Sequence, residues 1–324
     1  MDVYDEDEIR RAVTRADALA AVERAFAALA RGEAVLPEPM GLHLPEVEGE
    51  VHVKGGWLRG GPVFAFKVAS GFYRNRERGL PTGSGLFLVF DAATGVPRAL
   101  LQDNGWLTEM RTGAAGALAA RLLTPDRPLT VAMIGSGVQA RFQLRALAEV
   151  RSVRGLRAWS RNPEHVRAYL DEVGPELEEL EDAVAAETVE EAVRGADLVV
   201  TVTPSREPIV EARWVEPGAT VVAVGSDGPG KCELAPDLVA GADRVVVDRR
   251  DQSLRLGELQ RPVSSGLMTV ADVHAELGEV LIGRRPGRED DRERVVCDLT
   301  GVGVQDVAIA ETAWRRLAGE GEVA

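Results

Sequence analysis

The sequence is poor in the residues that mark several protein classes. It contains only two cysteines, Cys232 and Cys297, among 324 residues. Two cysteines are too few for a disulfide framework, and their spacing is not that of a zinc site, so we predict no metal centre. No apolar run reaches the ~18 residues that a membrane-spanning helix needs, so we expect no membrane association. The formal net charge of −14 excludes the basic surface that nucleic-acid-binding proteins present.

The N-terminus lacks the pattern of a secretory signal. Residues 1–8 are rich in aspartate and glutamate, whereas a signal peptide begins with basic residues followed by an apolar stretch. With a hydrophobic content of 45%, this composition is typical of a soluble globular protein, and we expect a cytoplasmic location. The chain of 324 residues exceeds the about 250–300 residues at which a single core stops growing, which favours two domains.

The first part of the chain has the pattern of an α+β domain. Residues 14–31 show helical periodicity behind an N-cap at Thr14, with Asp17 three residues later. The hairpin-like spacing of the extended segments that follow predicts an antiparallel sheet. These segments are residues 51–58, 63–68, 86–90 and 96–101. We place the end of this domain at residue 124, because a proline-containing turn follows the alanine-rich helix expected at 107–123.

From residue 125 the pattern changes to alternating strands and helices. The expected strands are residues 131–134, 156–159, 198–202, 220–224, 244–247 and 295–297. Such alternation predicts an α/β domain with a doubly wound parallel sheet, spanning residues 125–302. The highly charged stretch at 283–294 has the composition of a solvated loop. The helix expected at 305–317 could return to the first domain.

A glycine-rich turn near the start of the second domain carries the clearest functional signal. Residues 129–141 form an apolar strand that runs into Gly135-Ser136-Gly137 and then into a helix. Gly135 permits the tight turn, Gly137 lets the backbone approach a pyrophosphate, and Ala140 allows close packing of helix on strand. The helix N-terminus offers its free N–H groups to the phosphates. Because a second strand follows at βαβ spacing, the sequence predicts a Rossmann dinucleotide-binding site.

The end of the second strand indicates which dinucleotide binds. Enzymes that prefer NAD carry an Asp or Glu there, which holds the ribose 2′-hydroxyl and repels a 2′-phosphate. This chain has Ser160-Arg161-Asn162 instead, and a hydroxyl and a guanidinium suit the phosphate of NADP. A solvent-facing Arg161 without a ligand is the alternative interpretation. We therefore favour NADP(H), with NAD(H) as the other possibility.

Polar residues follow several of the predicted parallel strands. They are Ser160, Thr203, Asp227 and Thr300. Because the carboxyl ends of parallel strands meet at one edge of a sheet, we expect these residues to converge on the cofactor crevice. Asp227 lies in a glycine-rich turn, where a carboxylate could exchange a proton with a substrate nitrogen. An ordinary turn-forming aspartate is the alternative.

Four motifs together resemble those of the ornithine cyclodeaminase and mu-crystallin family. They are Phe66-Lys67, residues 107–115 (LTEMRTGAA), residues 134–140 (IGSGVQA) and residues 225–234 (GSDGPGKCEL). The resemblance extends over nearly the whole chain and both domains. It implies a homodimer in which a Rossmann domain is joined to a substrate-binding and dimerisation domain, the latter completed by the C-terminal helix at 303–324. Members of the family include cyclodeaminases, alanine and arginine dehydrogenases, and ketimine or iminosuccinate reductases.

The resemblance assigns the carboxylate of an amino or imino acid substrate to Lys67 and Arg111. Arginine binds a carboxylate bidentately, and a lysine whose pKa is lowered by burial could also assist proton transfer. Considered alone, Lys67 could be an edge-strand charge, whereas an unpaired Arg111 within an apolar helix would be costly. The resemblance also makes Asp227 the acid/base carboxylate and Thr300 a substrate-side residue.

The residues that we expect to contact the cofactor come from the glycine-rich turn, from the end of the second strand and from positions matched to the family. They are Thr82, Arg111, Gly135, Gly137, Val138, Gln139, Ser160, Arg161, Asn162, Thr203, Val224 and Lys231.

The chain departs from the ornithine cyclodeaminases in three places. Ser160 replaces their NAD-selecting aspartate, and their early substrate-binding arginine has no counterpart near Pro39-Met40. His52 and Lys54 lie where a glutamate serves the distal amine, and strand alternation puts both on one face. They could face a second carboxylate, as an iminosuccinate-like substrate would require, or form the exposed face of an edge strand.

We therefore predict an NAD(P)H-dependent reductase that converts an α-imino acid into an L-amino acid, equivalently an amino acid dehydrogenase. Residues 63–120 are most similar to the branch that holds iminosuccinate reductases and the cyclodeaminase-like proteins of ectoine utilisation. One alternative is a cyclodeaminase that recycles a bound NAD without net redox change. The other is a non-catalytic NADP-binding protein of the mu-crystallin type.

Overall fold

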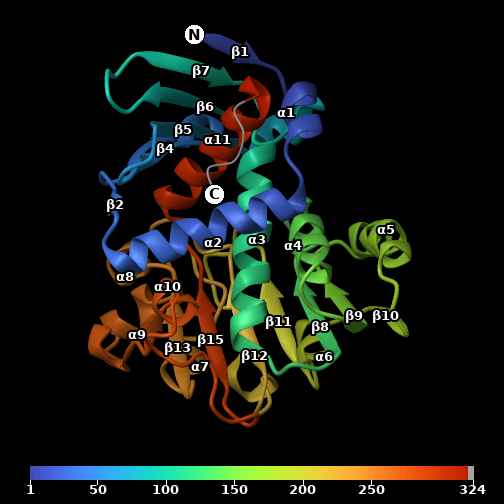
Figure 1. The fold of residues 1–324 in the computed structure, drawn as a ribbon. Coiled ribbons are helices and arrows are strands. Elements are labelled where there is room, and N and C mark those ends of the chain that lie inside the picture. Colours follow the sequence, from blue (N-terminus) through green and yellow to red (C-terminus); the bar gives the residue numbers. More distant parts are fainter. Residues whose placement is uncertain (320–324) are drawn as a thin grey trace. The chain divides into compact units, whose positions relative to one another are not determined.

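The computed structural model describes residues 1–319, except for the side chain of Arg76. The chain forms two compact units (Figure 1). The first is Met1–Arg111 with the C-terminal segment from Val302, and the second is Thr112–Gly301. Helix α3 (Trp106–Leu123) begins in the first unit and ends in the second. Within the described part of the chain, no helix is both long and apolar enough to cross a bilayer.

The first unit is built on a seven-stranded sheet. Its strands are β1 (Asp2–Tyr4), β2 (Ala34–Val35), β3 (Met40–Leu44), β4 (Gly49–Leu58), β5 (Val63–Phe72), β6 (Gly83–Asp91) and β7 (Pro97–Leu101). The order is β1-β7-β6-β5-β4-β2, with β3 also paired to β4. The antiparallel prediction is confirmed for β2 to β7, whereas β1 pairs with β7 in parallel. The short strands β1, β2 and β3 were not predicted.

Helices α1 (Glu6–Ala12), α2 (Arg15–Arg31) and α11 (Gly303–Ala318) also belong to the first unit. The predicted cap of α2 is confirmed, because the Thr14 hydroxyl accepts from the Asp17 N–H at 3.1 Å and the Asp17 carboxylate accepts from the Thr14 N–H at 2.9 Å. Helix α11 packs on β4, β5 and α2. An ion pair of 2.6 Å joins Arg316 of α11 to Asp17. The C-terminal helix is thus part of the first unit.

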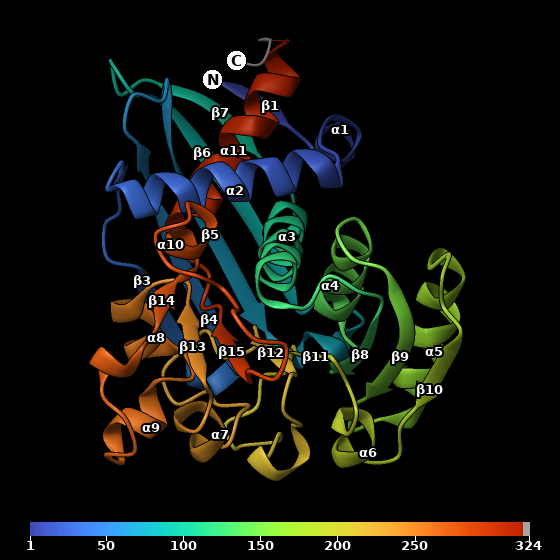
Figure 2. The same cartoon turned by 60° about the horizontal axis from the view of Figure 1, so that its bottom comes forward.

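The second unit is an eight-stranded sheet in which every pairing is parallel (Figure 2). Its strands are β8 (Leu129–Ile134), β9 (Val153–Trp159), β10 (Asp182–Ala185), β11 (Leu198–Thr201), β12 (Thr220–Ala223), β13 (Arg244–Val247), β14 (Ala275–Glu276) and β15 (Val295–Asp298). Its helices are α4 (Val138–Ala148), α5 (Pro163–Val173), α6 (Val189–Val193), α7 (Pro236–Ala240), α8 (Arg250–Leu256), α9 (Gln260–Ser264) and α10 (Leu277–Leu281).

The strand order of this sheet is β10-β9-β8-β11-β12-β15-β13-β14. The direction of winding reverses between β8 and β11, which is where ligands bind in open α/β sheets. Strands β11, β12, β13 and β15 are buried along their whole length, as expected for parallel strands covered on both faces. The doubly wound prediction is confirmed. Two short strands, β10 and β14, were not predicted.

The charged insertion at 283–294 is a loop whose residues are mostly exposed, as predicted, but two of its side chains are anchored to the second unit. Arg288 donates from Nε to the Leu123 carbonyl and from Nη2 to the Thr220 hydroxyl, each at 2.9 Å. Glu293 binds the buried Arg244 with two hydrogen bonds of 2.8 and 2.9 Å. Composition alone could not reveal this, because the partners lie far away in the sequence.

Buried carboxylates tie the carboxyl ends of the parallel strands together. Glu233 is fully buried and accepts from the Thr201 hydroxyl at 2.7 Å, the Gly225 N–H at 2.8 Å, and both the N–H and hydroxyl of Thr203 at 2.6 and 2.7 Å. It therefore links the end of β11 to the end of β12. These four hydrogen bonds favour the ionised carboxylate, but desolvation dominates and raises the pKa of Glu233 to about 7.

A second set of buried carboxylates continues this network. Glu258 accepts from the N–H groups of Glu233 at 2.8 Å and Leu234 at 3.2 Å, and its pKa is raised to about 7 by burial and by the charge of Glu233. Asp298, at the end of β15, accepts from the Glu258 N–H at 2.9 Å and from the Ser253 hydroxyl. Burial raises its pKa as well. The carboxyl ends of β11, β12 and β15 are thus joined through side chains.

The part of helix α3 that lies in the second unit packs closely against α4. A Cβ added at Gly113 would lie 2.6 Å from the Phe142 backbone oxygen, and one added at Gly116 would meet the Gln143 side chain. This packing explains why the compact units divide at Arg111/Thr112, whereas the sequence placed the domain boundary after residue 124. The boundaries of independently folding domains stay a prediction.

We expect Gly113→Ala to destabilise the protein. The added methyl meets a backbone atom that cannot move aside, and such overpacking costs ~1–3 kcal/mol, more than the up to ~1 kcal/mol gained in helix propensity. Gly137→Ala is the matched control, because its Cβ would have no neighbour within 4 Å. Urea unfolding followed by circular dichroism measures both. Equal stabilities of the two variants would contradict the packing argument.

We also expect the stability of the protein to depend on Glu258 in a pH-dependent way. Glu233 and Glu258 keep their protons in the folded chain up to about pH 7, whereas an unfolded glutamate releases its proton near 4.5. Raising the pH through this window therefore lowers the free energy of unfolding. Glu258→Gln removes one of these titrations and should make the decline shallower in urea unfolding at about pH 5, 6 and 7. Exposed Glu46→Gln should leave the wild-type slope unchanged, and a Glu258→Gln slope equal to wild type would refute the assignment.

Candidate active site

The predicted dinucleotide turn lies at the switch between β8 and β11. Gly135 follows β8 with φ of 118°, a conformation that favours glycine, and a Cβ there would lie 2.9 Å from the Val202 side chain. Gly137 is the N-cap of α4, and a Cβ added there would have no neighbour within 4 Å. The next residue, Val138, is 59% exposed. The free N–H groups at the start of this 11-residue helix are therefore accessible. This arrangement fits a pyrophosphate.

Arg141 of α4 stabilises the dinucleotide turn by hydrogen bonds to its backbone. Its Nη1 donates to the carbonyl of Ser136 at 2.9 Å and to that of Gly137 at 3.1 Å. Its Nε pairs with Glu172 at 2.7 Å, and the guanidinium lies 5.5 Å from the centre of the Tyr169 ring. Arg141 thus holds the turn through its carbonyl oxygens, while the Gly135 N–H donates to the Trp159 carbonyl at 2.8 Å. Sequence reasoning missed this residue, although it immediately follows the motif.

The residues at the end of β9 lie beside the turn, as predicted. The Ser136 hydroxyl donates to the Ser160 hydroxyl at 2.9 Å, and Ser160 donates to the Asn162 carbonyl at 3.0 Å. The Asn162 side chain caps α5 by accepting from the Glu164 N–H at 2.9 Å. Arg161 is exposed. The end of β9 thus presents a hydroxyl and a guanidinium, with no carboxylate from residues 160–162.

Asp227 and Lys231 form an ion pair in the turn after β12. Lys231 Nζ donates to Asp227 Oδ1 at 2.6 Å, and the lysine side chain is 9% exposed while the aspartate side chain is 46% exposed. Thr203, after β11, is held by Glu233 as described above. Val224 and Gly225 lead from β12 into the same turn. Thr203 and the Asp227–Lys231 pair therefore lie after adjacent strands of the sheet, β11 and β12.

Two other predicted residues of this unit are already engaged. Thr300 is 1% exposed, its N–H donates to Asp248 at 2.7 Å, and its hydroxyl accepts from Gln252 at 2.8 Å. Gln139 accepts from Gln143 at 2.9 Å. Thr300 is therefore fixed at the end of β15, with its polar atoms turned to protein partners.

In the first unit the structure brings Lys67 and Arg111 together on a carboxylate that the sequence did not single out. Asp306 of α11 accepts from Lys67 Nζ at 2.9 Å and from Arg111 Nε at 3.0 Å. All three side chains are at least 94% buried. Burial and the Arg111 charge lower the pKa of Lys67 to about 7, although Asp306 opposes this shift. A Gln-Asp pair within the otherwise apolar run of residues 302–310 was the available signal.

The lysines of this chain are all at predicted functional positions. The sequence holds three, Lys54, Lys67 and Lys231, and they are 7%, 2% and 8% exposed. Lys54 and Lys67 are partners in the β4–β5 ladder, so their side chains share one face of the sheet. Both strands are paired on two sides, which rules out the edge-strand interpretations of Lys54 and Lys67.

His52 and Thr82 lie apart from the Asp306 contacts. His52 Nε2 is 3.7 Å from Glu50 Oε2, and its ring meets that of His43 edge-on at 6.4 Å. Thr82 accepts a backbone hydrogen bond from Phe72 at 2.7 Å in the loop before β6. The structure therefore joins Lys67 and Arg111 through Asp306, whereas the contacts of His52 and Thr82 described above are with other residues.

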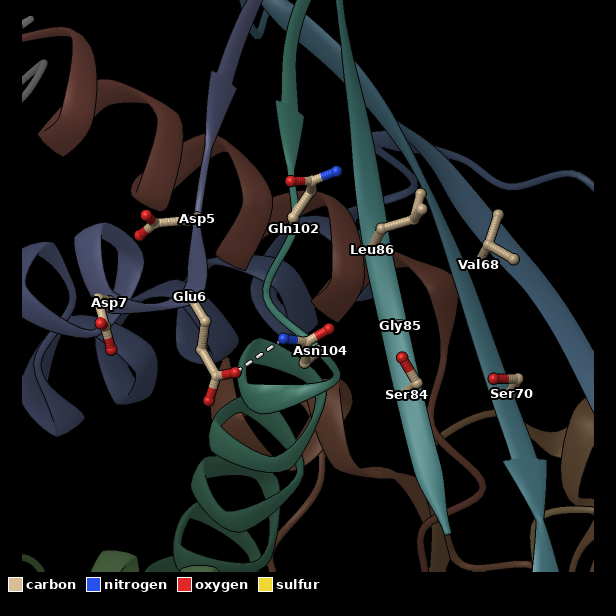
Figure 3. Close-up of a pocket in the computed structure, with 10 residues that line it drawn as sticks. All are labelled: Asp5, Glu6, Asp7, Val68, Ser70, Ser84, Gly85, Leu86, Gln102 and Asn104. Carbon is tan, nitrogen blue, oxygen red and sulfur yellow. Dashed lines mark hydrogen bonds between the residues drawn. The ribbon is translucent and has the colours of Figure 1, made fainter. Parts of the chain in front are cut away.

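The first unit also contains a cavity of about 600 Å³ (Figure 3). It is lined by Asp5, Glu6, Asp7, Val68, Ser70, Ser84, Gly85, Leu86, Gln102 and Asn104. Glu6 accepts from Asn104 at 2.9 Å, which joins α1 to the loop before α3. Since Val68 and Ser70 alternate with Lys67 along β5, the cavity lies on the opposite sheet face from Lys67. None of the predicted site residues lines it.

Known proteins are similar to this sequence over nearly its whole length. The model of the ornithine cyclodeaminase/mu-crystallin family matches residues 2–321. Two rhizobial proteins are 42% identical over 318 residues, one from Rhizobium meliloti named as a dehydrogenase and one from Sinorhizobium fredii named as a cyclodeaminase. These alignments cover 98% of this chain and 95% and 96% of the relatives. The iminosuccinate reductase of Paracoccus denitrificans is 35% identical over 96% of this chain and 95% of its own.

Solved structures agree with these alignments. The Δ1-pyrroline-2-carboxylate reductase of Thermococcus litoralis, in complex with NADH and L-proline, matches with a TM-score of 0.93 and 29% identity over 98% of both chains. An archaeal alanine dehydrogenase dimer with bound NAD matches with a TM-score of 0.91 and 33% identity, over 100% of this chain and 98% of the other. Because sequence, fold and family model agree over nearly the full length, the chain belongs to the ornithine cyclodeaminase/mu-crystallin family.

Proposed function

We propose that this protein is an NAD(P)H-dependent reductase that converts an α-imino acid into an L-amino acid, which in reverse is an amino acid dehydrogenase. The buried Lys67–Arg111 pair carries the proposal, because two buried cations that share one carboxylate favour an additional anionic ligand. The relatives support it, since one is an iminosuccinate reductase and another was solved with NADH and L-proline.

Lys67 and Arg111 bind the substrate carboxylate and so orient the adjacent imine. When bound, a nicotinamide cofactor supplies the hydride that reduces the imine carbon. Asp227 exchanges a proton with the substrate nitrogen, because this nitrogen becomes more basic when the imine is reduced to an amine. Lys231 holds Asp227 Oδ1 by its 2.6 Å hydrogen bond and so fixes the orientation of the carboxylate in the turn after β12. The substrate gains one hydride and one proton.

The cofactor contacts follow the order of the strand ends in the second unit. Gly135, Gly137, Val138 and Gln139 hold the pyrophosphate, and Ser160, Arg161 and Asn162 hold the adenosine ribose. Thr203, Val224 and Lys231 serve the nicotinamide half. Thr82 and Arg111 contribute further contacts from the first unit, and Thr300 serves the substrate.

We infer a preference for NADP(H) over NAD(H). The Ser160 hydroxyl and the exposed Arg161 guanidinium stand where NAD-specific enzymes carry a carboxylate. Arginine binds a phosphate with two charge-assisted hydrogen bonds. The solved relatives hold NADH and NAD, so a preference for NADP(H) would distinguish this chain from them.

We infer that the substrate can carry a second carboxylate. Lys54 is buried and lies directly across the ladder from Lys67, so a further cation lies on the sheet face where Lys67 would bind the first carboxylate. Its charge also lowers the pKa of Lys67. His52 lies two residues before Lys54 and contributes on the same face. An imino dicarboxylate has two negative charges that these basic side chains could bind.

We further infer a cytoplasmic homodimer. The archaeal alanine dehydrogenase that this chain resembles was solved as a dimer. The residues from 125 to 302 then form the dinucleotide domain, and residues 1–124 with 303–324 form the substrate and dimerisation domain. Size-exclusion chromatography with light scattering measures the assembly.

We expect Lys67→Met and Asp227→Asn each to lower kcat/KM for imino acid reduction by ~10²–10⁴-fold, the contribution of a positioned acid–base or charged group. Lys67→Met should also raise KM, because it removes a carboxylate contact, whereas Asp227→Asn should act mainly on kcat. Oxidation of NADPH is followed at 340 nm, with oxaloacetate or pyruvate plus ammonia and with Δ1-pyrroline-2-carboxylate as substrates. Exposed Asp237→Asn is the matched control and should retain wild-type rates.

Two outcomes separate the proposal from its alternatives. Release of ammonia from ornithine without net NADPH oxidation would make the protein a cyclodeaminase. Tight NADPH binding without turnover of any imino acid would support the non-catalytic role. Wild-type activity of Asp227→Asn would exclude Asp227 from proton transfer.

We expect Arg161→Ala to raise KM for NADPH by ~10–100-fold, since charged hydrogen bonds are each worth ~1.5–3 kcal/mol, while KM for NADH stays nearly constant. Exposed Arg167→Ala in the following helix is the control for loss of a positive charge near the site. Initial rates at varied NADPH and NADH measure the ratio. An equal loss for both cofactors would place Arg161 outside the 2′-phosphate site.

A further inference from the structure

Asp306 is a buried carboxylate whose contacts are with the two proposed substrate-binding cations. Its side chain is 1% exposed, and Oδ1 accepts from both Lys67 Nζ at 2.9 Å and Arg111 Nε at 3.0 Å. Lys67 comes from β5, Arg111 from α3 and Asp306 from α11, so one oxygen atom connects three elements of the first unit. Because all three side chains are buried, water cannot readily take the place of Asp306 as the partner of the two cations.

A close helix–strand contact places Asp306 where it can make these bonds. A Cβ added at Gly303 would lie 2.6 Å from the Gly55 backbone oxygen, so the start of α11 lies directly on β4. Asp306 follows one turn after Gly303, on the same side of the helix. Gly55 is next to Lys54 in β4, and its ladder partner Phe66 is next to Lys67 in β5. The helix therefore presents its first carboxylate to the lysine face of the sheet.

The charges around Lys67 explain why its protonation depends on Asp306. The groups that act on it are Asp306 from α11, Arg111 from α3, Lys54 from β4 and, just before α3, Asp103. Burial and the two cations lower the pKa of Lys67, while Asp306 raises it by charge and by its hydrogen bond. With the resulting value of about 7, Lys67 changes charge near neutral pH. Loss of Asp306 moves that change to lower pH.

We propose that Asp306 is a positioning residue that holds Lys67 and Arg111 in a fixed pair and keeps Lys67 cationic for the substrate carboxylate. This role deepens the proposed function and rests on it, since the pair acts on the substrate. Asp306 itself binds no substrate. A carboxylate that served only to fasten α11 to the sheet would stabilise the fold without affecting the charge of Lys67.

The scarcity of lysine allows a direct test that needs no substrate. Protein labelled with ¹³Cε-lysine contains three labelled side chains, and Lys67→Arg and Lys54→Arg assign them. In Asp306→Asn the Lys67 titration should move to lower pH by ~1–3 units, the effect of removing an opposite charge in direct contact. Lys231, whose partner is Asp227, should titrate as in the wild type. An unshifted Lys67 titration overturns the proposal.

Kinetics supply the second measurement. In Asp306→Asn the alkaline limb of kcat/KM for imino acid reduction should move to lower pH by the same interval as the Lys67 titration. Asp306→Glu keeps the charge but displaces it, so its Lys67 titration should stay closer to wild type while KM for the substrate rises. Should Asp306→Asn fail to fold, an unchanged KM in Asp306→Glu overturns the proposal.

A matched control removes another carboxylate contact of α11. Asp17→Asn breaks the ion pair with Arg316 but touches neither Lys67 nor Arg111, so it should leave the Lys67 titration and the pH profile unchanged. A Lys67 shift in Asp306→Asn together with an inactive wild type would refute the reductase and retain the positioning role. An active wild type without a Lys67 shift in Asp306→Asn would retain the reductase and refute the positioning role.

Discussion

A charged group removed from water has to find its partners within the fold, and this constraint organises both units of the protein. Asp306 meets it in the first unit by accepting from Lys67 and Arg111 through one oxygen. Glu233 meets it in the second unit by accepting four hydrogen bonds from Thr201, Thr203 and Gly225. In each case the partners come from separate elements, so satisfying the carboxylate also positions the residues that we propose to act in binding and catalysis.

The two carboxylates differ in what they do to the groups around them. Asp306 is an anion between cations, and its pKa is lowered by Lys67 and Arg111 despite complete burial. Glu233 has hydroxyl and N–H partners without a cation among its hydrogen-bond donors, and burial raises its pKa to about 7. Asp306 therefore balances the charges of Lys67 and Arg111, whereas Glu233 joins strand ends and keeps its proton to a higher pH than an ordinary glutamate. We propose that the first affects ligand binding, and we expect the second to affect stability as the pH changes.

Much of the fold could be predicted because its signals are local. The cap at Thr14, the turn at Gly135 and the valine-rich parallel strands each depend on residues within one short segment. The edge-strand interpretation of Lys67 failed because pairing on both sides of β5 depends on strands that precede and follow it. The anchoring of the loop at 283–294 could not be predicted for the same reason, since Arg288 donates to the Leu123 carbonyl.

The dinucleotide turn, the alternation of strands and helices, and the residue types available for an imino acid can all be read from short stretches of sequence, because these follow from local conformation and chemistry. The position of Asp306 between Lys67 and Arg111, and the contact of Glu233 with Thr203, depend instead on how distant segments pack. Lys67 and Asp306 are separated by 239 positions along the chain, and their contact arises from the close approach of Gly303 to Gly55. No periodicity or motif specifies such a distance, because it is set by the packing of a helix on a sheet.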